Sequence, residues 1–231
     1  MLTAAHAEIN INRSDADFLA YVENSGIICF MAIDAKFSTV GSVASLQGGY
    51  PFRGSIEESA DGSTLAVQMK DVDPDQGVNW SGVIRTSLAG RKQPDWLKAG
   101  DVLFVSKGAR FYAVCIDEPP SAAVCSPHFF LLQVLPRAAL LPAFLAWQIN
   151  QPPFQRQLQQ AAEGSSQLSI RRPVLESLTL SVPSLADQQR IVALADLARQ
   201  ERRTLHQLIH NREQQLQALA EGLAHAAQAA H

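Results

Sequence analysis

The chain has 231 residues, of which 47% are hydrophobic and 18% charged, and its formal net charge is -3 at pH 7. This composition is globular and excludes a disordered chain, and the length suffices for one large core or two small ones. The slight acidic excess counts mildly against a nucleic-acid-binding protein, and the lack of a signal-peptide pattern or of an apolar run of roughly 18 residues predicts a cytoplasmic protein without a membrane partner.

Residues 1–36 predict a short α/β lead-in to the main fold. Ser14 and Asp17 have the spacing of a helix N-cap, and Gly26 is placed to end that helix. The apolar run IICFMAI at 27–33 favours a buried strand.

Residues 37–133 have the pattern of a β region, because short apolar segments alternate with turn-forming stretches. The pattern predicts a curved, mixed sheet with long loops, where recognition residues usually lie. The apolar segments are STVGSVASLQ, TLAVQM, GDVLFVS, RFYAVCI and HFFLLQV.

Two helices are expected next, at LPAFLAWQIN (141–150) and at PPFQRQLQQAAEG (152–164). Each has a proline at or near its start, and Gly164 is placed to end the second helix. The following stretch, QLSIRRPVLESLTLSV at 167–182, is interpreted as strand-like and leads to Pro183.

The last segment, residues 184–231, predicts one long helix. It has no proline and a single glycine, and it is rich in residues that favour helix. Ser184 followed by Asp187 is typical of an N-cap with an acidic first turn. A continuous helix would be roughly 70 Å long at 1.5 Å per residue.

Apolar residues of this segment form two rows at steps of seven or multiples of seven, which is typical of a coiled-coil seam. Arg202 and Arg212 interrupt the rows. A helix of this length cannot bury its apolar stripe against so small a domain, so a partner helix is expected. The residues expected to contact it are Ile191, Leu205, Ile209, Leu216, Leu219 and Leu223.

The residues just before this helix indicate where the domain ends. Pro183 cannot donate a hydrogen bond to a strand ladder and biases Val182 away from helix, so it ends the domain. Gln188 and Gln189 then fall in the first turns of the helix, and two interpretations of the pair stay open. Either one side chain binds backbone of the domain while the other faces out, or both are solvated.

Three stretches resemble the specificity (S) subunit of type I restriction–modification systems. The first is LPAFLAWQINQPPFQRQLQQAAEGSSQLSIRRPVLESLTLSVPSLADQQRIVALADLARQ, which is similar to the end of a target recognition domain and the start of its long helix. The second is LKAGDVLFVSKGA, and the third is VGSVASLQGGYPFRGS followed by LAVQMKDV. The resemblance covers about residues 37–205, and the first proline of the family's P-x-P-x-x-x-x-Q stretch is replaced here. Residues 1–36 have no counterpart in the family pattern.

The resemblance implies an α+β fold, with a target recognition domain at 1–183, including the atypical lead-in at 1–36, and a dimerisation or spacer helix at 184–231. A full S subunit carries two recognition domains and two helices, so one of each implies a half-size subunit that works as a homodimer. The implied partners are double-stranded DNA, a methyltransferase (modification) subunit and, in some systems, a restriction subunit. The chain itself would be non-catalytic and would need no cofactor.

DNA contacts are expected from basic side chains on or beside the loops, because arginine can read guanine and lysine can pair with phosphate. Acidic residues are about as numerous in the same region, so the alternative is a solvated surface. The candidates are Arg53, Lys70, Arg85, Arg91, Lys92, Lys107, Arg110, Arg171 and Arg172.

Signals for catalysis are weak. NQPPF at 150–154 approaches the motif with which a DNA methyltransferase holds its target base, but the asparagine is displaced by one residue, and a proline-started helix is the stronger interpretation. Cys115, Cys125 and His128 suggest a thiol nucleophile or a zinc site, yet zinc needs three or four ligands at recognisable spacing. The remaining alternative is an interaction scaffold that has the recognition fold but does not read DNA.

Overall fold

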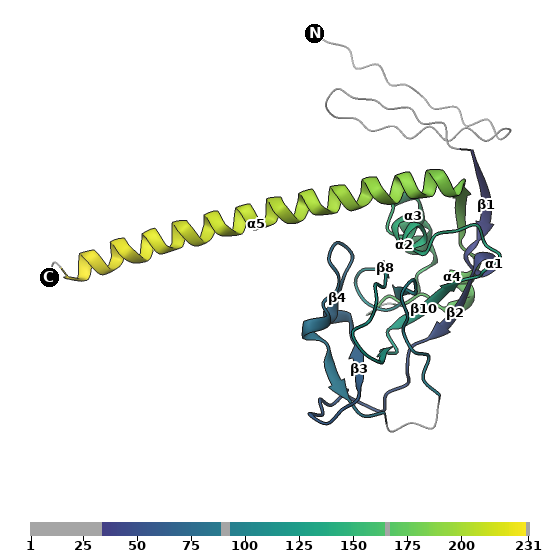
Figure 1. The fold of residues 1–231 in the computed structure, drawn as a ribbon, viewed down its shortest axis with the longest axis horizontal. Helices are drawn as coiled ribbons and strands as arrows, with labels where there is room; N and C mark the ends of the chain where they lie inside the picture. The colour runs from purple at the N-terminus through teal and green to yellow at the C-terminus, as the bar shows by residue number, and fades with distance from the viewer. Residues whose placement is uncertain (1–33, 89–92, 165–166, 230–231) are drawn as a thin grey trace, which may run out of the picture.

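The computed structural model describes residues 34–88, 93–164 and 167–229, with side chains described up to residue 222. The helix expected before Gly26 and the strand expected at 27–33 lie outside these ranges. A globular body is followed by one long helix that projects far beyond it (Figure 1). The elements are β1 (Ala35–Thr39), α1 (Val40–Val43), β2 (Ala44–Gly48), β3 (Thr64–Val67), η1 (Met69–Asp71), β4 (Val72–Asp73), β5 (Gly77–Val78), η2 (Trp80–Gly82), β6 (Ile84–Thr86), β7 (Val102–Val105), β8 (Ala113–Cys115), β9 (Ala123–Cys125), β10 (Phe129–Val134), α2 (Pro142–Ile149), α3 (Pro152–Ala161), α4 (Arg172–Ser177), β11 (Thr179–Pro183) and α5 (Leu185–Ala229).

The strands of the described chain are divided among several sheets, although the sequence pattern suggested one continuous sheet. The largest is antiparallel with the order β2-β10-β7-β8, and a second has the order β6-β3-β9, in which β3 and β9 are parallel. Two antiparallel pairs, β1–β11 and β4–β5, complete the set. The α+β class expected from the sequence is confirmed.

Strand β7 explains why the body has two cores. All four of its residues are buried, and successive side chains of a strand point to opposite faces. Val102 and Phe104 join the core that contains α2, α3 and α4, while Leu103 and Val105 join the core formed with β3 and β9. The four-stranded sheet therefore lies between two apolar layers, one largely helical and one made of strands.

The stretch at 167–182 differs from the strand expected there. Arg172–Ser177 forms the short helix α4, with Pro173 in its first turn, and only Thr179–Pro183 is a strand, β11. Proline is well suited to the first turn of a helix because it has no N–H to leave unpaired. Strand β11 pairs antiparallel with β1, so the segment just before α5 is tied to the first described strand.

The helix pair expected at 141–164 is confirmed, and so is the structural interpretation of NQPPF. Asn150 caps α2, and Pro152 and Pro153 open α3. The Asn150 side chain accepts a hydrogen bond from the Ala113 N–H at 2.8 Å and donates one to the Ala113 carbonyl at 2.8 Å. The Asn150 side chain thus pairs with the backbone of β8 as a neighbouring strand would. This structural role explains the asparagine and the prolines of NQPPF without a catalytic function.

Two adjacent glycines give a sharp test of packing in the body. A Cβ on Gly49 would lie 2.0 Å from the carbonyl oxygen of Ser126, whereas a Cβ on Gly48 would meet nothing within 4 Å. We expect Gly49→Ala to lower the free energy of unfolding by about 2–3 kcal/mol, because two backbone segments must separate. Gly48→Ala should change it by less than about 0.5 kcal/mol. Urea unfolding of both variants measures the difference, and equal stabilities would contradict the contact.

The start of α5 is fixed to the body by a buried glutamine. Ser184 caps the helix, since its Oγ accepts a hydrogen bond from the Asp187 N–H at 3.2 Å. The Gln188 side chain is fully buried, accepts from the Leu141 N–H at 2.8 Å, and donates to the carbonyls of Ala139 and Pro183 at 2.7 and 2.9 Å. Gln189 is exposed. Of the two interpretations of the glutamine pair, the one in which a single side chain binds the domain is confirmed.

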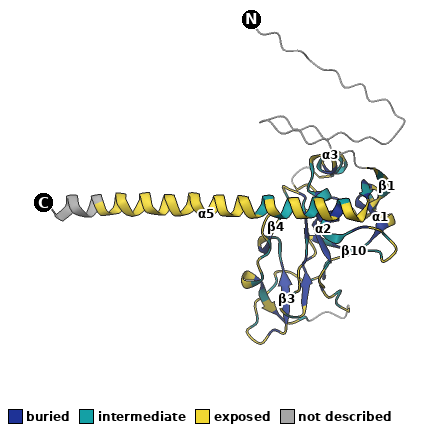
Figure 2. Cartoon of the chain, turned by 45° about the horizontal axis from the view of Figure 1, so that its top comes forward, coloured by how far each residue is buried: buried dark blue, intermediate teal, exposed yellow. Residues whose placement is uncertain are grey.

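The first half of α5 lies along the body, and the second half extends free of it. Ile191 and Val192 pack against the helical core. The Arg202 guanidinium pairs with the Asp75 carboxylate at 2.8 Å, and Arg203 donates to the Asp75 backbone carbonyl. From Glu201 to Gly222 every side chain is exposed, as the yellow part of the helix in Figure 2 shows.

Candidate functional site

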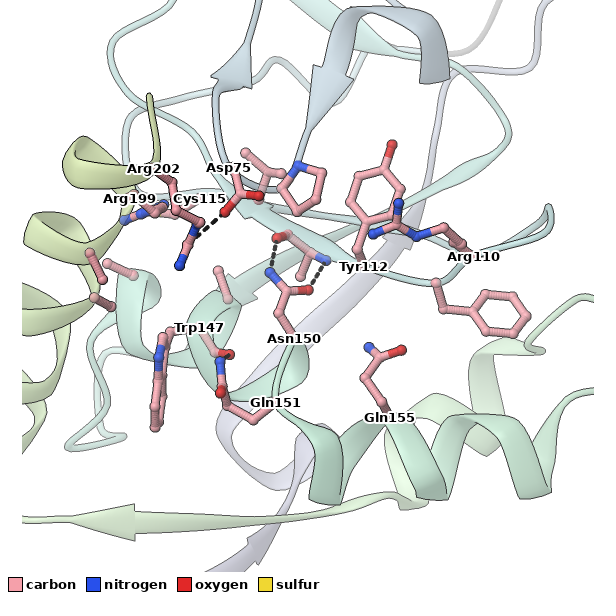
Figure 3. A pocket seen from close by; sticks show the side chains of 18 of the residues that line it. Asp75, Arg110, Tyr112, Cys115, Trp147, Asn150, Gln151, Gln155, Arg199 and Arg202 are labelled. Carbon is pink, nitrogen blue, oxygen red and sulfur yellow. Dashed lines mark hydrogen bonds and ion pairs between the residues drawn. The ribbon is translucent and has the colours of Figure 1, made fainter. Parts of the chain in front are cut away.

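A cavity of about 710 Å³ lies where α5 passes over the body (Figure 3). Its walls come from β8, from α2 and α3, from the turn between β4 and β5, and from one face of α5. The hydrogen bonds between Asn150 and Ala113 fix the β8 side of the cavity. Residues far apart in the sequence therefore share one cleft between the recognition-like body and the long helix.

Three arginines reach this cavity, and their ion pairing differs. Arg202 pairs with Asp75 of the β4–β5 turn, and Arg199 pairs with Asp196 on its own helix. Arg110 is exposed and has no ion-pair partner within the described ranges. It is therefore the cavity arginine that is free to bind an anion.

Amide side chains of α3 line the cavity beside Arg110. Gln151 donates to the carbonyl of Trp147 at 3.0 Å, and Gln155 donates to the carbonyl of Ile149 at 2.8 Å. These bonds satisfy carbonyls at the end of α2 and hold both amides at the rim. Figure 3 shows Gln155 and Arg110 on the same side of the cavity. An arginine beside fixed amides is a set suited to phosphates and to the edges of bases.

The ionisable groups of the cavity wall do not form a nucleophile. Burial raises the pKa of the Cys115 thiol to about 11, with Asp117 adding to the effect, so the thiol is protonated at neutral pH. Burial also raises the pKa of Tyr112, and Asp73 adds to that rise while Arg110 opposes it. The Tyr112 hydroxyl donates to the carbonyl of Val72 at 2.9 Å, which holds the β4 segment against β8.

The structure brings part of the predicted basic set together. Lys107 forms an isolated bridge with Ser169, and the Gly108 N–H donates to the carbonyl of Leu168 at 3.0 Å. Met69 of η1 lies beside Gly108, so its neighbour Lys70 belongs to the same region. Lys70, Lys107, Arg110 and Arg171 thus come from three segments that meet around Gly108, whose φ of 134° is one that side chains disfavour.

Arg171 of this group is paired with an acid, and the remaining predicted basic residues lie elsewhere or are paired as well. Arg171 and Arg172 are paired at 2.7 Å with Glu163 and Glu176, respectively. Arg53 is exposed on the loop after β2, and Arg85 is exposed on β6, which lies at the edge of its sheet. Arg91 and Lys92 lie outside the described residues. The loop that carries Arg53 is held by a hydrogen bond from Tyr50 to the Cys125 carbonyl at 2.8 Å and by the edge-to-face contact of Tyr50 with Phe52.

Sequence reasoning missed the α5 side of the cavity. Arg202 was interpreted only as an interruption of the apolar rows, and Arg199 was not singled out. The signal was the small-residue pair Ala195 and Ala198 next to them, because small side chains allow a helix to lie close to a neighbouring surface. Both alanines line the cavity.

The alternative chemistries find no support in the described chain. Cys125 is buried, and His128 is exposed at the turn before β10. In residues 34–88, 93–164 and 167–222, no group of three or more His, Cys, Asp or Glu side chains is arranged to hold a metal ion. Among the helices of the described ranges, none combines the length and the apolar character needed to cross a membrane.

The predicted partner-helix residues also separate into two groups. Leu205, Ile209, Leu216 and Leu219 are 55–66% exposed. Ile191 is half-buried and packs against the helical core, so its own chain already accounts for it. The side chain of Leu223 is not among those described.

Comparison with known proteins gives no match to a family model and no match to a curated protein. Solved structures do match. One is a chain from a structure of the type I R-M system that addresses its complex assembly and conformational transition. It has a TM-score of 0.57 at 18% identity, and the match covers 80% of this chain and 43% of that one. The HsdS subunit from Thermoanaerobacter tengcongensis has a TM-score of 0.50 at 16% identity, over 72% and 38% of the two chains.

A third match, the type I restriction–modification S subunit from M. genitalium, has a TM-score of 0.49 at 15% identity and covers 70% of this chain and 38% of its own. The chain therefore spans about two fifths of the length of the solved structures that it matches. In fold, the described chain resembles a type I restriction–modification S subunit, as the sequence motifs predicted.

Proposed function

We propose that this chain is a half-size, non-catalytic specificity subunit that recognises a DNA sequence and directs a methyltransferase subunit to it. The observation that carries the proposal is the fold shared with type I S subunits over 80% of the chain. In this proposal residues 1–183 read DNA, and residues 184–231 space two copies and hold the modification subunit. Methyl transfer, and cleavage where a restriction subunit joins, belong to the partners.

DNA reading is assigned to the basic region around Gly108. Lys107 and Arg110 project from one loop, are exposed, and have no ion pair in the described ranges. The backbone at Gly108 can approach a phosphate closely because it carries no side chain. Lys107 is suited to phosphate and Arg110 to phosphate or guanine. The net charge of the chain does not oppose this, since recognition depends on where the free cations lie.

Dimerisation is assigned to α5, because none of the described residues of the body covers its apolar face. Leu194 and Leu197 are 69% and 57% exposed even where α5 lies along the body, and the exposed row continues to Leu219. Burying a leucine side chain fully is worth about 1.5–3 kcal/mol. Six such leucines on each of two helices can offset the roughly 4–15 kcal/mol that association costs.

The alternative is a scaffold with the recognition fold that does not read DNA. Its support is the neutralisation of Arg171, Arg172 and Arg202 by nearby acids. Selection from random duplexes separates the two, using the chain alone and together with a modification subunit encoded beside its gene. A consensus sequence, bound more weakly as salt rises, is expected for the specificity subunit. If the assembled complex enriches no sequence, the scaffold function stands.

A pair of arginine variants tests the assigned region. Arg110→Ala should weaken binding to the selected duplex about tenfold, because a free arginine contact to a base or phosphate is worth about 1–3 kcal/mol. Arg171→Ala should weaken it less than about threefold, because Glu163 already neutralises that arginine. Fluorescence anisotropy with a labelled duplex at fixed salt measures both. Equal losses for the two variants would place the DNA elsewhere on the body.

A further inference from the structure

Six exposed leucines of α5, from Leu194 onward, repeat every eleven residues, not every seven. Leu194, Leu205 and Leu216 form one row, and Leu197, Leu208 and Leu219 form the other. Each of these six side chains is 57–69% exposed. Between the pairs of leucines, at the same position of each repeat, stand Glu201 and Arg212. An eleven-residue repeat keeps its stripe on one side of a nearly straight helix, without the left-handed supercoil of heptads.

These six leucines, with Glu201 and Arg212 between them, form a stripe whose spacing is the same in both directions. From Leu194 to Leu219 its members are separated by steps of 3, 4, 4, 3, 4, 4 and 3 residues, a palindromic series centred between His206 and Gln207. A two-fold axis at that point places Leu194 opposite Leu219, Leu197 opposite Leu216, and Leu205 opposite Leu208. The same axis places Glu201 of one copy opposite Arg212 of the other. A surface that is complementary to itself under a two-fold rotation is what a closed dimer requires.

We infer that α5 binds the α5 of a second copy of this chain, antiparallel, with the axis between His206 and Gln207. The inference rests on the pairing of two copies in the proposed function and adds the register, since the antiparallel direction is already what the resemblance to S subunits implies. The six leucines of the stripe on each helix then meet leucines, and two Glu201–Arg212 ion pairs form within the stripe.

The charges exclude the competing arrangements. A shift of the axis by half a repeat toward the body places Glu201 opposite Glu201 of the other copy. The opposite shift places Arg212 opposite Arg212 of the other copy. Each shift also leaves two leucines of each helix without a leucine opposite. In a parallel pair in register, Glu201 faces Glu201 and Arg212 faces Arg212. Like charges that face each other in an interface are strongly unfavourable, and charged positions set partner orientation in helix pairs.

The body leaves room for this partner. The side of α5 that contacts the body includes Gln188, Ile191, Val192 and Ala195, which are buried or half-buried. Leu194 and Leu197 belong to the adjacent side and are 69% and 57% exposed, although they lie beside the body. One helix therefore has two faces, one occupied by its own body and the other open from Leu194 outward (Figure 2).

Cysteine cross-linking of the full-length chain tests the register. Leu194→Cys and Leu219→Cys are made separately and co-expressed, and disulfide-linked dimers are counted after mild oxidation. The mixture should give covalent dimers at least about tenfold more than either variant alone, because a disulfide needs Cα atoms within about 7 Å. The unmodified chain, with its own three cysteines, sets the background. Mixtures of Leu194→Cys with Leu208→Cys, and of Leu205→Cys with Leu219→Cys, test the two shifted axes and should stay at background.

A charge exchange gives an independent readout. Glu201→Arg alone and Arg212→Glu alone should each raise the dimer dissociation constant about tenfold or more, and the double exchange should restore it to within about threefold. Cross-linking of each single variant with itself, or a double exchange no better than the singles, overturns the antiparallel register. If the unmodified chain also sediments as a dimer, the dimer itself stands. A monomer that gives no covalent product in any mixture overturns the pairing in the proposed function as well.

Discussion

Replacing Gln188 with alanine should lower the free energy of unfolding by about 3 kcal/mol. The side chain is fully buried and makes three hydrogen bonds, all to backbone, at Ala139, Leu141 and Pro183. Alanine would leave one N–H and two carbonyls without that partner, and each buried unsatisfied group costs about 1–3 kcal/mol. Movement of the start of α5 would let water reach some of these groups. The expected loss is therefore less than the sum of the costs of three unsatisfied groups.

Gln189 provides the matched control in the neighbouring position. Its side chain is exposed, so Gln189→Ala should change the free energy of unfolding by less than about 0.5 kcal/mol. Urea unfolding followed by tryptophan fluorescence reports on the body, where all three tryptophans lie at 80, 96 and 147. Gln188→Glu keeps the hydrogen bond accepted from the Leu141 N–H but loses both donated bonds. We expect its free energy of unfolding to lie between those of Gln188→Ala and the native chain. If the carboxylate stays buried and charged, its free energy of unfolding falls below that of Gln188→Ala. Equal stability of the Gln188→Ala and Gln189→Ala variants would show that α5 does not depend on this junction.

The junction shows what the sequence could reveal. Pro183 and Ser184 have strong local preferences, so the end of β11 and the start of α5 were predictable from residue type. The role of Gln188 was predictable only as one of two alternatives, because its partners at 139 and 141 lie almost fifty residues away. Local chemistry places the boundary, and tertiary contacts decide which glutamine is buried.

The errors have the same origin. The sequence RRPVLES was taken for part of a strand-like stretch, although Pro173 suits the first turn of the short helix that forms. The very short strands β4 and β5 flank Pro74 and Asp75, where turn signals dominate the sequence. Long-range contacts hold this pair, namely the hydrogen bond from Tyr112 to the Val72 carbonyl and the ion pair of Asp75 with Arg202 of α5.

The basic set illustrates the limit for the candidate site. A sequence shows that Lys107, Arg110 and Arg171 are basic, but it does not show which of them an acid neutralises. Glu163 reaches Arg171 because the chain folds back at 163–169 and forms a bridge there. The heptad rows were a plausible reading of α5, because Leu205, Ile209, Leu216 and Leu219 fit them. Exposure of Leu194, Leu197 and Leu208 reveals the eleven-residue repeat that the heptads obscured.

The strength of the proposed dimer should depend on the two leucines nearest its axis. Leu205 and Leu208 are 57% and 59% exposed in the single chain, so a second copy is what would bury them. Truncating leucine to alanine removes three carbons, and at about 0.8 kcal/mol per buried carbon and about 60% burial each truncation costs about 1.4 kcal/mol. The double variant Leu205→Ala/Leu208→Ala changes four side chains in a dimer, so its dissociation constant should rise by roughly four powers of ten at 1.4 kcal/mol per factor of ten.

Sedimentation equilibrium over a range of concentrations measures this loss, and the stability of the body separates it from misfolding. The body should unfold at the same urea concentration in the variant and in the native chain, because both leucines are more than half exposed in the single chain. Gln200→Ala/Gln207→Ala is the matched control, since both glutamines are exposed, lie in the same part of α5 and stand outside the row of leucines. That control should remain dimeric. If the leucine variant stays as tightly dimeric as the glutamine variant while the body is intact, the copies associate through the body, and the long helix is left open for a different partner.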